Sequence, residues 1–190
     1  KHMKLAWLTD IHLNFLNKSK RYKFYDSISE KKPDGVLITG DIGEADSVEK
    51  FLLEMEDRLK IKIYFVLGNH DYYRSSIKQV RMNINDLSRN SSLLHWMPQS
   101  RMIELTSDTA LIGHDGWADG RLGDWENSEL ILNDYNLIKD FKPSMDVPLQ
   151  NILTLGSSTG KHAKMRWLFT MRSLADEANE FISGVLLKAL

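Results

Sequence analysis

Residues 63–71 read IYFVLGNHD, and this stretch decides the fold class. Its apolar part, residues 63–67, is too short for a helix and rich in branched and aromatic side chains, which is typical of a buried strand. Gly68 then allows the backbone to turn tightly. Asn69 and His70 therefore follow directly on a strand end, where open α/β sheets place their binding sites.

Two earlier stretches repeat this pattern of a buried strand followed by polar residues. They are LAWLTDIH at residues 5–12 and VLITGD at residues 36–41. Apolar residues at helical spacing lie between the strands, and Asp46 or Ser47 can cap the second helix. Each helix has its own apolar face: Tyr22, Tyr25 and Ile28 in the first; Val48, Phe51, Leu52, Met55 and Leu59 in the second. Alternating strands and helices predict an α/β fold with a parallel sheet.

Polar side chains at the ends of these strands are predicted to converge on one edge of the sheet. Asp10 and His12 point the same way if extended geometry continues across Ile11. Asp41 ends the second strand, and Asn69 follows the third. Carboxylate, amide and imidazole groups together suit Mn, Fe or Zn better than Ca or a soft copper site. Two such ions about 3.5 to 4 Å apart can orient a hydroxide at phosphorus, which indicates phosphoryl chemistry.

The three polar blocks DIH, GD and GNHD, in this order and spacing, resemble the calcineurin-like metallophosphoesterase family. The resemblance implies a four-layer αββα sandwich of two sheets flanked by helices. It also implies a hydrolase that cleaves a phosphomonoester or phosphodiester by metal-bound hydroxide. The cofactors that it implies are two divalent metal ions, Mn2+ first, with Fe, Zn, Ni or Mg as alternatives.

The same resemblance assigns roles by motif position. Asp10 and His12 would hold the first metal and Asp41 would bridge the two ions. Asn69 would hold the second metal, and His70 would be the catalytic histidine, acting as general acid. Asp71 is expected to orient His70 or to cap a turn rather than to bind metal.

The family carries three further histidine ligands in two later motifs, and neither motif is found after residue 125, where His162 is the remaining histidine. We therefore expect one domain over residues 3–190 that is truncated and incomplete at its carboxyl end. Such a chain could itself be inactive. Lys1 and His2 are interpreted as remnants of expression cloning. The alternative function is a non-catalytic scaffold or protein-interaction module that retains the phosphoesterase fold.

The rest of the chain gives a weaker pattern. Helices are predicted at about residues 76–87 and 161–190, and little regular structure over residues 133–160. The second helix has a continuous apolar face that requires a partner: Met165, Leu168, Phe169, Ala178, Phe181, Ile182, Val185 and Leu186. Short strand-like pieces around residues 93–96, 102–105 and 110–112 predict an antiparallel meander.

Residues 113–125, GHDGWADGRLGDW, carry four glycines and predict an ordered loop near the site. Within it, His114 is a candidate for a missing metal ligand or a substrate contact, or else a hydrogen-bonding residue. Arg121 is a candidate contact to a substrate phosphate, or else the partner of Asp119 or Asp124.

Composition limits the substrate and the compartment. With 25 basic and 26 acidic residues the net charge is -1, so no basic field favours nucleic acid, although nucleic acid stays open. A small phosphoester or a nucleotide is the expected substrate, and a protein phosphatase is disfavoured because IGEAD follows the second block. The absence of cysteine fits a cytoplasmic protein. No apolar run reaches about 20 residues, so no membrane partner is expected, and the oligomeric state stays open.

Overall fold

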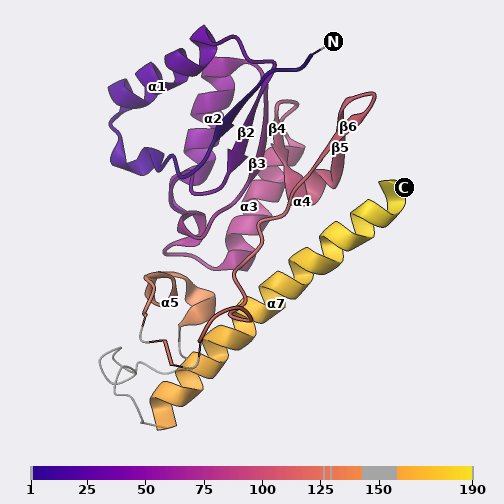
Figure 1. The fold of residues 1–190 in the computed structure, drawn as a ribbon. Helices are drawn as coiled ribbons and strands as arrows, with labels where there is room; N and C mark the ends of the chain where they lie inside the picture. The colour runs from indigo at the N-terminus through magenta and orange to yellow at the C-terminus, as the bar shows by residue number, and fades with distance from the viewer. Residues whose placement is uncertain (1, 126, 129, 143–157, 190) are drawn as a thin grey trace.

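A four-stranded parallel sheet forms the framework of the N-terminal half of the chain (Figure 1). The computed structural model describes residues 2–125, 127–128, 130–142 and 158–189. Neighbouring strands follow the chain order, β1 to β4: β1 (Leu5–Leu8), β2 (Gly35–Thr39), β3 (Lys62–Val66) and β4 (Leu94–Trp96). The predicted α/β class with its parallel strands is confirmed.

Three helices follow the first three strands, as the apolar periodicity predicted. Their bounds are α1 (Lys18–Glu30), α2 (Val48–Leu59) and α3 (Ile77–Arg89). The side chains of Asn17 and Ser76 cap α1 and α3 by accepting hydrogen bonds from backbone N–H groups. Of the two residues considered for the start of α2, Ser47 occupies the cap position, and its hydroxyl bonds to the backbone of Glu44.

The two faces of the sheet differ in how they are covered. Strand pairing places Leu8, Ile38, Phe65 and Trp96 in one row across the sheet, on the face that the core helices cover. The next row lies on the opposite face, because side chains alternate along a strand: Trp7, Leu37, Tyr64 and His95. Trp7 is 72% exposed on this second face.

The prediction of an antiparallel meander after residue 91 is correct in part. β5 (Met102–Thr106) and β6 (Thr109–Ile112) form an antiparallel pair, as expected. The first piece, β4, pairs parallel with β3 instead, so its assignment to the meander is wrong. The reason is burial, since Leu94 and Trp96 complete the apolar core of the large sheet. A short helix, α4 (Met97–Ser100), then separates β4 from β5.

The last described elements are α5 (Asp134–Leu137), a 3-10 turn η3 (Lys139–Phe141) and the long helix α7 (Ser158–Ala189). The prediction of little regular structure is wrong at both ends of residues 133–160, and residues 143–157 lie outside the described part. Trp167 of α7 stacks on Tyr135 at 4.1 Å and donates its Nε1–H to the carbonyl of Phe141. Figure 1 shows α7, in orange and yellow, passing α5.

The apolar face predicted for α7 is only partly the buried one. Leu168 and Val185 are buried, whereas Met165 and Phe169 are exposed. No described helix combines the length and the apolar character needed to cross a membrane.

Candidate metal centre

The polar residues after β1 and β2 are held together by backbone hydrogen bonds that continue beyond both strands. The N–H of His12 donates to the carbonyl of Asp41 at 3.0 Å, and that of Asp10 donates to Gly40 at 3.3 Å. Asp10, His12 and Asp41 have φ angles of 51°, 39° and 53°, in the left-handed region. The condition of extended geometry across Ile11 is therefore not met, because the backbone turns at the residues on both sides of it.

Two glycines allow the loops after β2 and β3 to touch. A Cβ on Gly68 would lie 2.1 Å from Oδ1 of Asp41, and one on Gly40 would lie 2.9 Å from the Cα of Gly68. Gly40 also has a φ of 104°, which side chains rarely tolerate. Glycine at both positions is thus required for Asp41 to sit where it does.

His12, Asp41 and His70 form the cluster at the centre of the site. One potential ligand atom from each lies within 4.8 Å of the others. His12 Nε2 lies 3.8 Å from Asp41 Oδ2, and the His70 backbone N–H donates to Asp41 Oδ1 at 3.0 Å. The two imidazole rings meet edge to face at 4.6 Å. The structure therefore brings together His12, Asp41 and His70 from the residues predicted for the site.

The donor atoms of this cluster fit a divalent metal ion. His12 Nδ1 is buried and has no hydrogen-bond partner among the described residues, so the ring has bonding capacity that a ligand would use. Burial raises the pKa of Asp41, and the His70 N–H and the two imidazoles partly offset that rise. A cation bound here would favour the ionised carboxylate. Imidazole nitrogen and carboxylate oxygen together suit Mn, Fe or Zn.

Asp10 and Asn69 form hydrogen bonds with residues outside this cluster. Asp10 is exposed and its carboxylate accepts a hydrogen bond from the Thr9 hydroxyl, yet its charge still contributes to raising the pKa of Asp41. Asn69 donates from Nδ2 to Asp134 at 2.8 Å and to the Tyr73 hydroxyl at 3.3 Å. Metal ligation by Asp10 and Asn69 stays a prediction.

Asp71 ties the two loops of the site together. Its Oδ1 accepts the backbone N–H groups of Ile42 and Gly43 at 2.9 and 2.8 Å, and its Oδ2 accepts that of Gly68 at 2.9 Å. Burial raises the pKa of Asp71 to about 7 against the opposing effect of these three bonds. The carboxylate thus fixes the loop backbone around Asp41, which agrees with the expected turn-capping role.

His114 and Arg121 lie outside the cluster and contact α7. The His114 ring lies 5.0 Å from that of Phe181, and its Nδ1 accepts the Gly116 N–H. Arg121 pairs with Asp119 at 2.8 Å and with Asp176 at 2.7 Å. The expected pairing with a loop aspartate is thus seen at Asp119, and the roles of His114 and Arg121 as ligand or substrate contacts stay predictions.

Asp115 is a structural residue that the sequence did not reveal. Its carboxylate accepts hydrogen bonds from the Leu67 N–H, the Trp96 indole and the Tyr72 hydroxyl, at 2.8, 3.0 and 2.9 Å. Arg81 of α3 lies 3.3 Å away as its cationic partner. Asp115 anchors the glycine-rich loop to the end of β3, and an aspartate among four glycines carries no sequence signal for that role.

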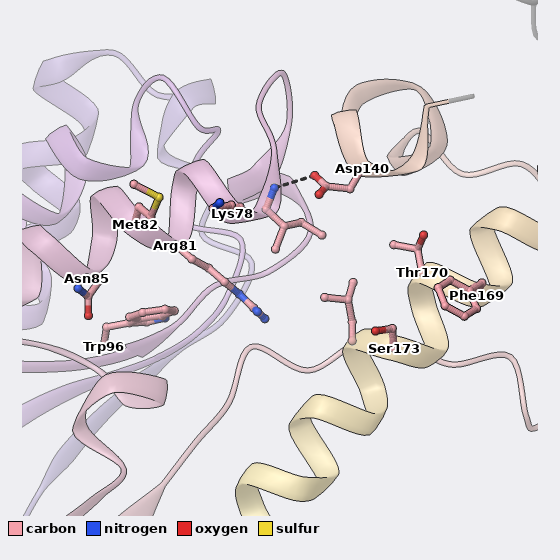
Figure 2. Close-up of a pocket in the computed structure, with 11 residues that line it drawn as sticks. Lys78, Arg81, Met82, Asn85, Trp96, Asp140, Phe169, Thr170 and Ser173 are labelled. Atoms are coloured by element: carbon pink, nitrogen blue, oxygen red, sulfur yellow. Dashed lines mark hydrogen bonds between the residues drawn. The ribbon is translucent and has the colours of Figure 1, made fainter. Parts of the chain in front are cut away.

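A separate groove of about 580 Å3 lies between α3 and α7 (Figure 2). Trp96 and Leu174 line it together with the exposed side chains of Met82 and Phe169. None of its lining residues belongs to the His12, Asp41 and His70 cluster. The groove is therefore not a part of the metal centre.

A parallel α/β sheet with a histidine and aspartate cluster beyond its strand ends belongs to the class of α/β domains that can hold a divalent metal ion at the sheet edge. The chain matches the family model of the calcineurin-like phosphoesterases over residues 3–178, and it belongs to that family. This family membership supports a metal-dependent phosphoesterase in general and confirms the resemblance seen in the sequence.

Three curated relatives match the chain. A zebrafish (Danio rerio) "Transmembrane protein with metallophosphoesterase domain" is 34% identical over 82 residues, 40% of this chain and 18% of that protein. The cattle (Bos taurus) protein of the same name is 32% identical over 79 residues, with the same coverage. "Uncharacterized protein L509" of Acanthamoeba polyphaga mimivirus is 27% identical over 151 residues, 71% of this chain and 51% of that protein. The match thus spans less than a fifth of the first two relatives, and no solved structure matches significantly.

Proposed function

We propose that this domain hydrolyses a phosphomonoester or phosphodiester of a small molecule or nucleotide with two divalent metal ions, Mn2+ in first place. The observation that carries the proposal is the cluster of His12, Asp41 and His70 within 4.8 Å, beyond the ends of three parallel strands. When bound, divalent ions supply hydroxide near neutral pH and neutralise charge on the phosphoryl oxygens. Fe, Zn, Ni and Mg are alternatives that the same donor atoms accept.

The residues divide the remaining work between them. Asp10 and His12 would hold the first ion, Asn69 would hold the second, and the Asp41 carboxylate would be shared by both. His70 is fixed through its backbone N–H on Asp41, and its ring packs against Tyr73 at 4.3 Å. From this position its ring would donate a proton to the leaving oxygen as the phosphorus–oxygen ester bond breaks and an oxygen from water forms the new bond to phosphorus. The proton moves from His70 to the leaving alkoxide, which departs as the alcohol.

The substrate and the setting of the domain are proposed more broadly. The net charge of -1 favours a small phosphoester or nucleotide over a nucleic acid backbone. The location in the cytoplasm stays a prediction, because two relatives are named transmembrane proteins. A single domain over residues 3–190 is likewise a prediction.

Hydrolysis of para-nitrophenyl phosphate and of its bis ester with added Mn2+ tests this function. The Asp41→Asn variant is expected to lose about a hundredfold or more in rate, because it removes the bridging charge. Asp46→Asn is the matched control, since Asp46 is exposed in the same loop. A folded chain that neither binds Mn2+ nor hydrolyses either ester would contradict the proposal and favour the scaffold alternative.

A further inference from the structure

A buried carboxylate from a distant part of the chain contacts the proposed asparagine ligand. Asp134 of α5 is 5% exposed, and its Oδ1 accepts a hydrogen bond from Asn69 Nδ2 at 2.8 Å across 65 positions of sequence. The same oxygen accepts the Tyr73 hydroxyl at 2.8 Å. Tyr73 in turn accepts a second hydrogen bond from Asn69 Nδ2, at 3.3 Å. Three side chains thus close a triangle of hydrogen bonds.

This triangle determines which end of the Asn69 amide faces Asp134 and Tyr73. An amide group has a donating end and an accepting end, and both contacts of Asn69 occupy the donating end. The amide carbonyl oxygen, the atom that would bind a divalent metal ion, takes no part in these two hydrogen bonds.

The segment that carries Asp134 is itself fixed against the loop that follows Asn69. The Arg74 N–H donates to the carbonyl of Leu137 at 2.7 Å, and the Lys139 N–H donates to that of Ser75 at 2.9 Å. Asp140 accepts the first N–H of α3 at 2.8 Å (Figure 2). Asp134 is therefore held in place by contacts that do not involve the metal site.

We propose that Asp134, with Tyr73, is a positioning pair that orients the Asn69 amide so that its oxygen binds the second metal ion. The inference rests on the proposed function, because it takes Asn69 as a ligand. Groups that orient a ligand in this way contribute about 10- to 100-fold to metal affinity. Asp134 touches neither the metal nor the substrate in this role, and it acts through Asn69 alone.

Mn2+ titration by calorimetry, with electron paramagnetic resonance to count bound ions, tests the pair without relying on activity. Asp134→Ala is expected to weaken the second Mn2+ by about 10- to 100-fold and to leave the first nearly unchanged. Asp134→Asn restores part of the affinity, because its amide oxygen still accepts the Asn69 hydrogen bond. Asp140→Ala is the matched control, since it loosens the same segment at its contact with α3 and spares Asn69.

Three results would overturn the inference, and they differ in what else they affect. Two Mn2+ ions bound to Asp134→Ala with wild-type affinity would remove the positioning role and leave the proposed function intact. An equal loss of affinity in Asp140→Ala would show that general loosening of the segment causes the effect. A wild-type chain that binds no second Mn2+ would refute the two-metal proposal and this inference together.

Discussion

Replacement of Asp71 by alanine is predicted to destabilise the fold more than any surface substitution near the site. Asp71 is fully buried, and its carboxylate accepts the N–H groups of Ile42, Gly43 and Gly68. Alanine would leave all three N–H groups without this acceptor, two of them in buried residues and that of Gly68 in a half-buried one. Loss of the carboxylate also leaves a void between the loops after β2 and β3.

The expected loss follows from counting these N–H groups. Each buried and unpaired donor costs about 1 to 3 kcal/mol, and relief of the buried carboxylate offsets a part of the sum. We expect Asp71→Ala to lower the free energy of unfolding by about 3 to 5 kcal/mol. Asp71→Asn keeps the shape and loses the bond to Gly68, so a loss of about 1 to 3 kcal/mol is expected.

Urea denaturation followed by tryptophan fluorescence, in buffer with EDTA, measures these free energies without a contribution from bound metal. At about 2 to 4 °C per kcal/mol, the alanine variant should also melt about 6 °C or more below the wild type. Asp46→Ala, on the exposed surface of the same loop, should change stability by about 0.5 kcal/mol or less. A loss below about 1 kcal/mol in Asp71→Ala, at an unchanged denaturant slope, would refute the reasoning.

Three further predictions concern other contacts. Arg21 donates two hydrogen bonds to Glu54 and lowers the pKa of its carboxyl. The pair therefore stabilises the fold at any pH above the pKa of Glu54 in the unfolded chain. This stabilisation is lost as the pH falls through the lower pKa that Glu54 has in the folded protein. Glu54→Gln should therefore flatten the fall in unfolding free energy between about pH 5 and pH 3, and an unchanged pH profile would contradict the pairing. Gly68→Ala should displace Asp41 and weaken Mn2+ binding by about tenfold or more, as measured by calorimetry. Unchanged affinity would mean that the loops after β2 and β3 move apart to make room for the methyl group. Arg121→Ala should leave KM for para-nitrophenyl phosphate unchanged, because Asp119 and Asp176 already pair with the guanidinium, and a raised KM would instead support the substrate contact.

The parallel sheet could be predicted because its strands are buried enough to give short apolar runs. The runs before Asp10, Asp41 and Asn69 all became neighbouring parallel strands. The sequence did not identify β4 as a member of this sheet. Its three residues lie between turn signals, and their pattern is the same whether the strand pairs with β3 or with β5. Only the burial of Trp96 beside Phe65 decides between them.

The site was predictable in residue type and position along the chain, and less so in geometry. His12, Asp41 and His70 converge as the strand ends suggested. The contact of Asp134 with Asn69 could not be foreseen, because it depends on how a segment 65 positions away folds back. Phe169 was assigned to the apolar face of α7 that needs a partner, but its side chain is exposed. Helical periodicity identifies apolar stripes on a helix and does not tell which stripe packs against the rest of the protein.

The left-handed backbone at Asp10, His12 and Asp41 decides which mutants are informative here. Aspartate and asparagine accept this conformation at low cost, whereas alanine adds about 1 kcal/mol or more of backbone strain at each position. An alanine scan across the motif would thus confound ligand removal with a change in chain geometry. Asparagine removes only the charge of an aspartate, and glycine removes the side chain without the strain. The difference in unfolding free energy between the alanine and glycine variants at Asp41 would measure the backbone strain at this position.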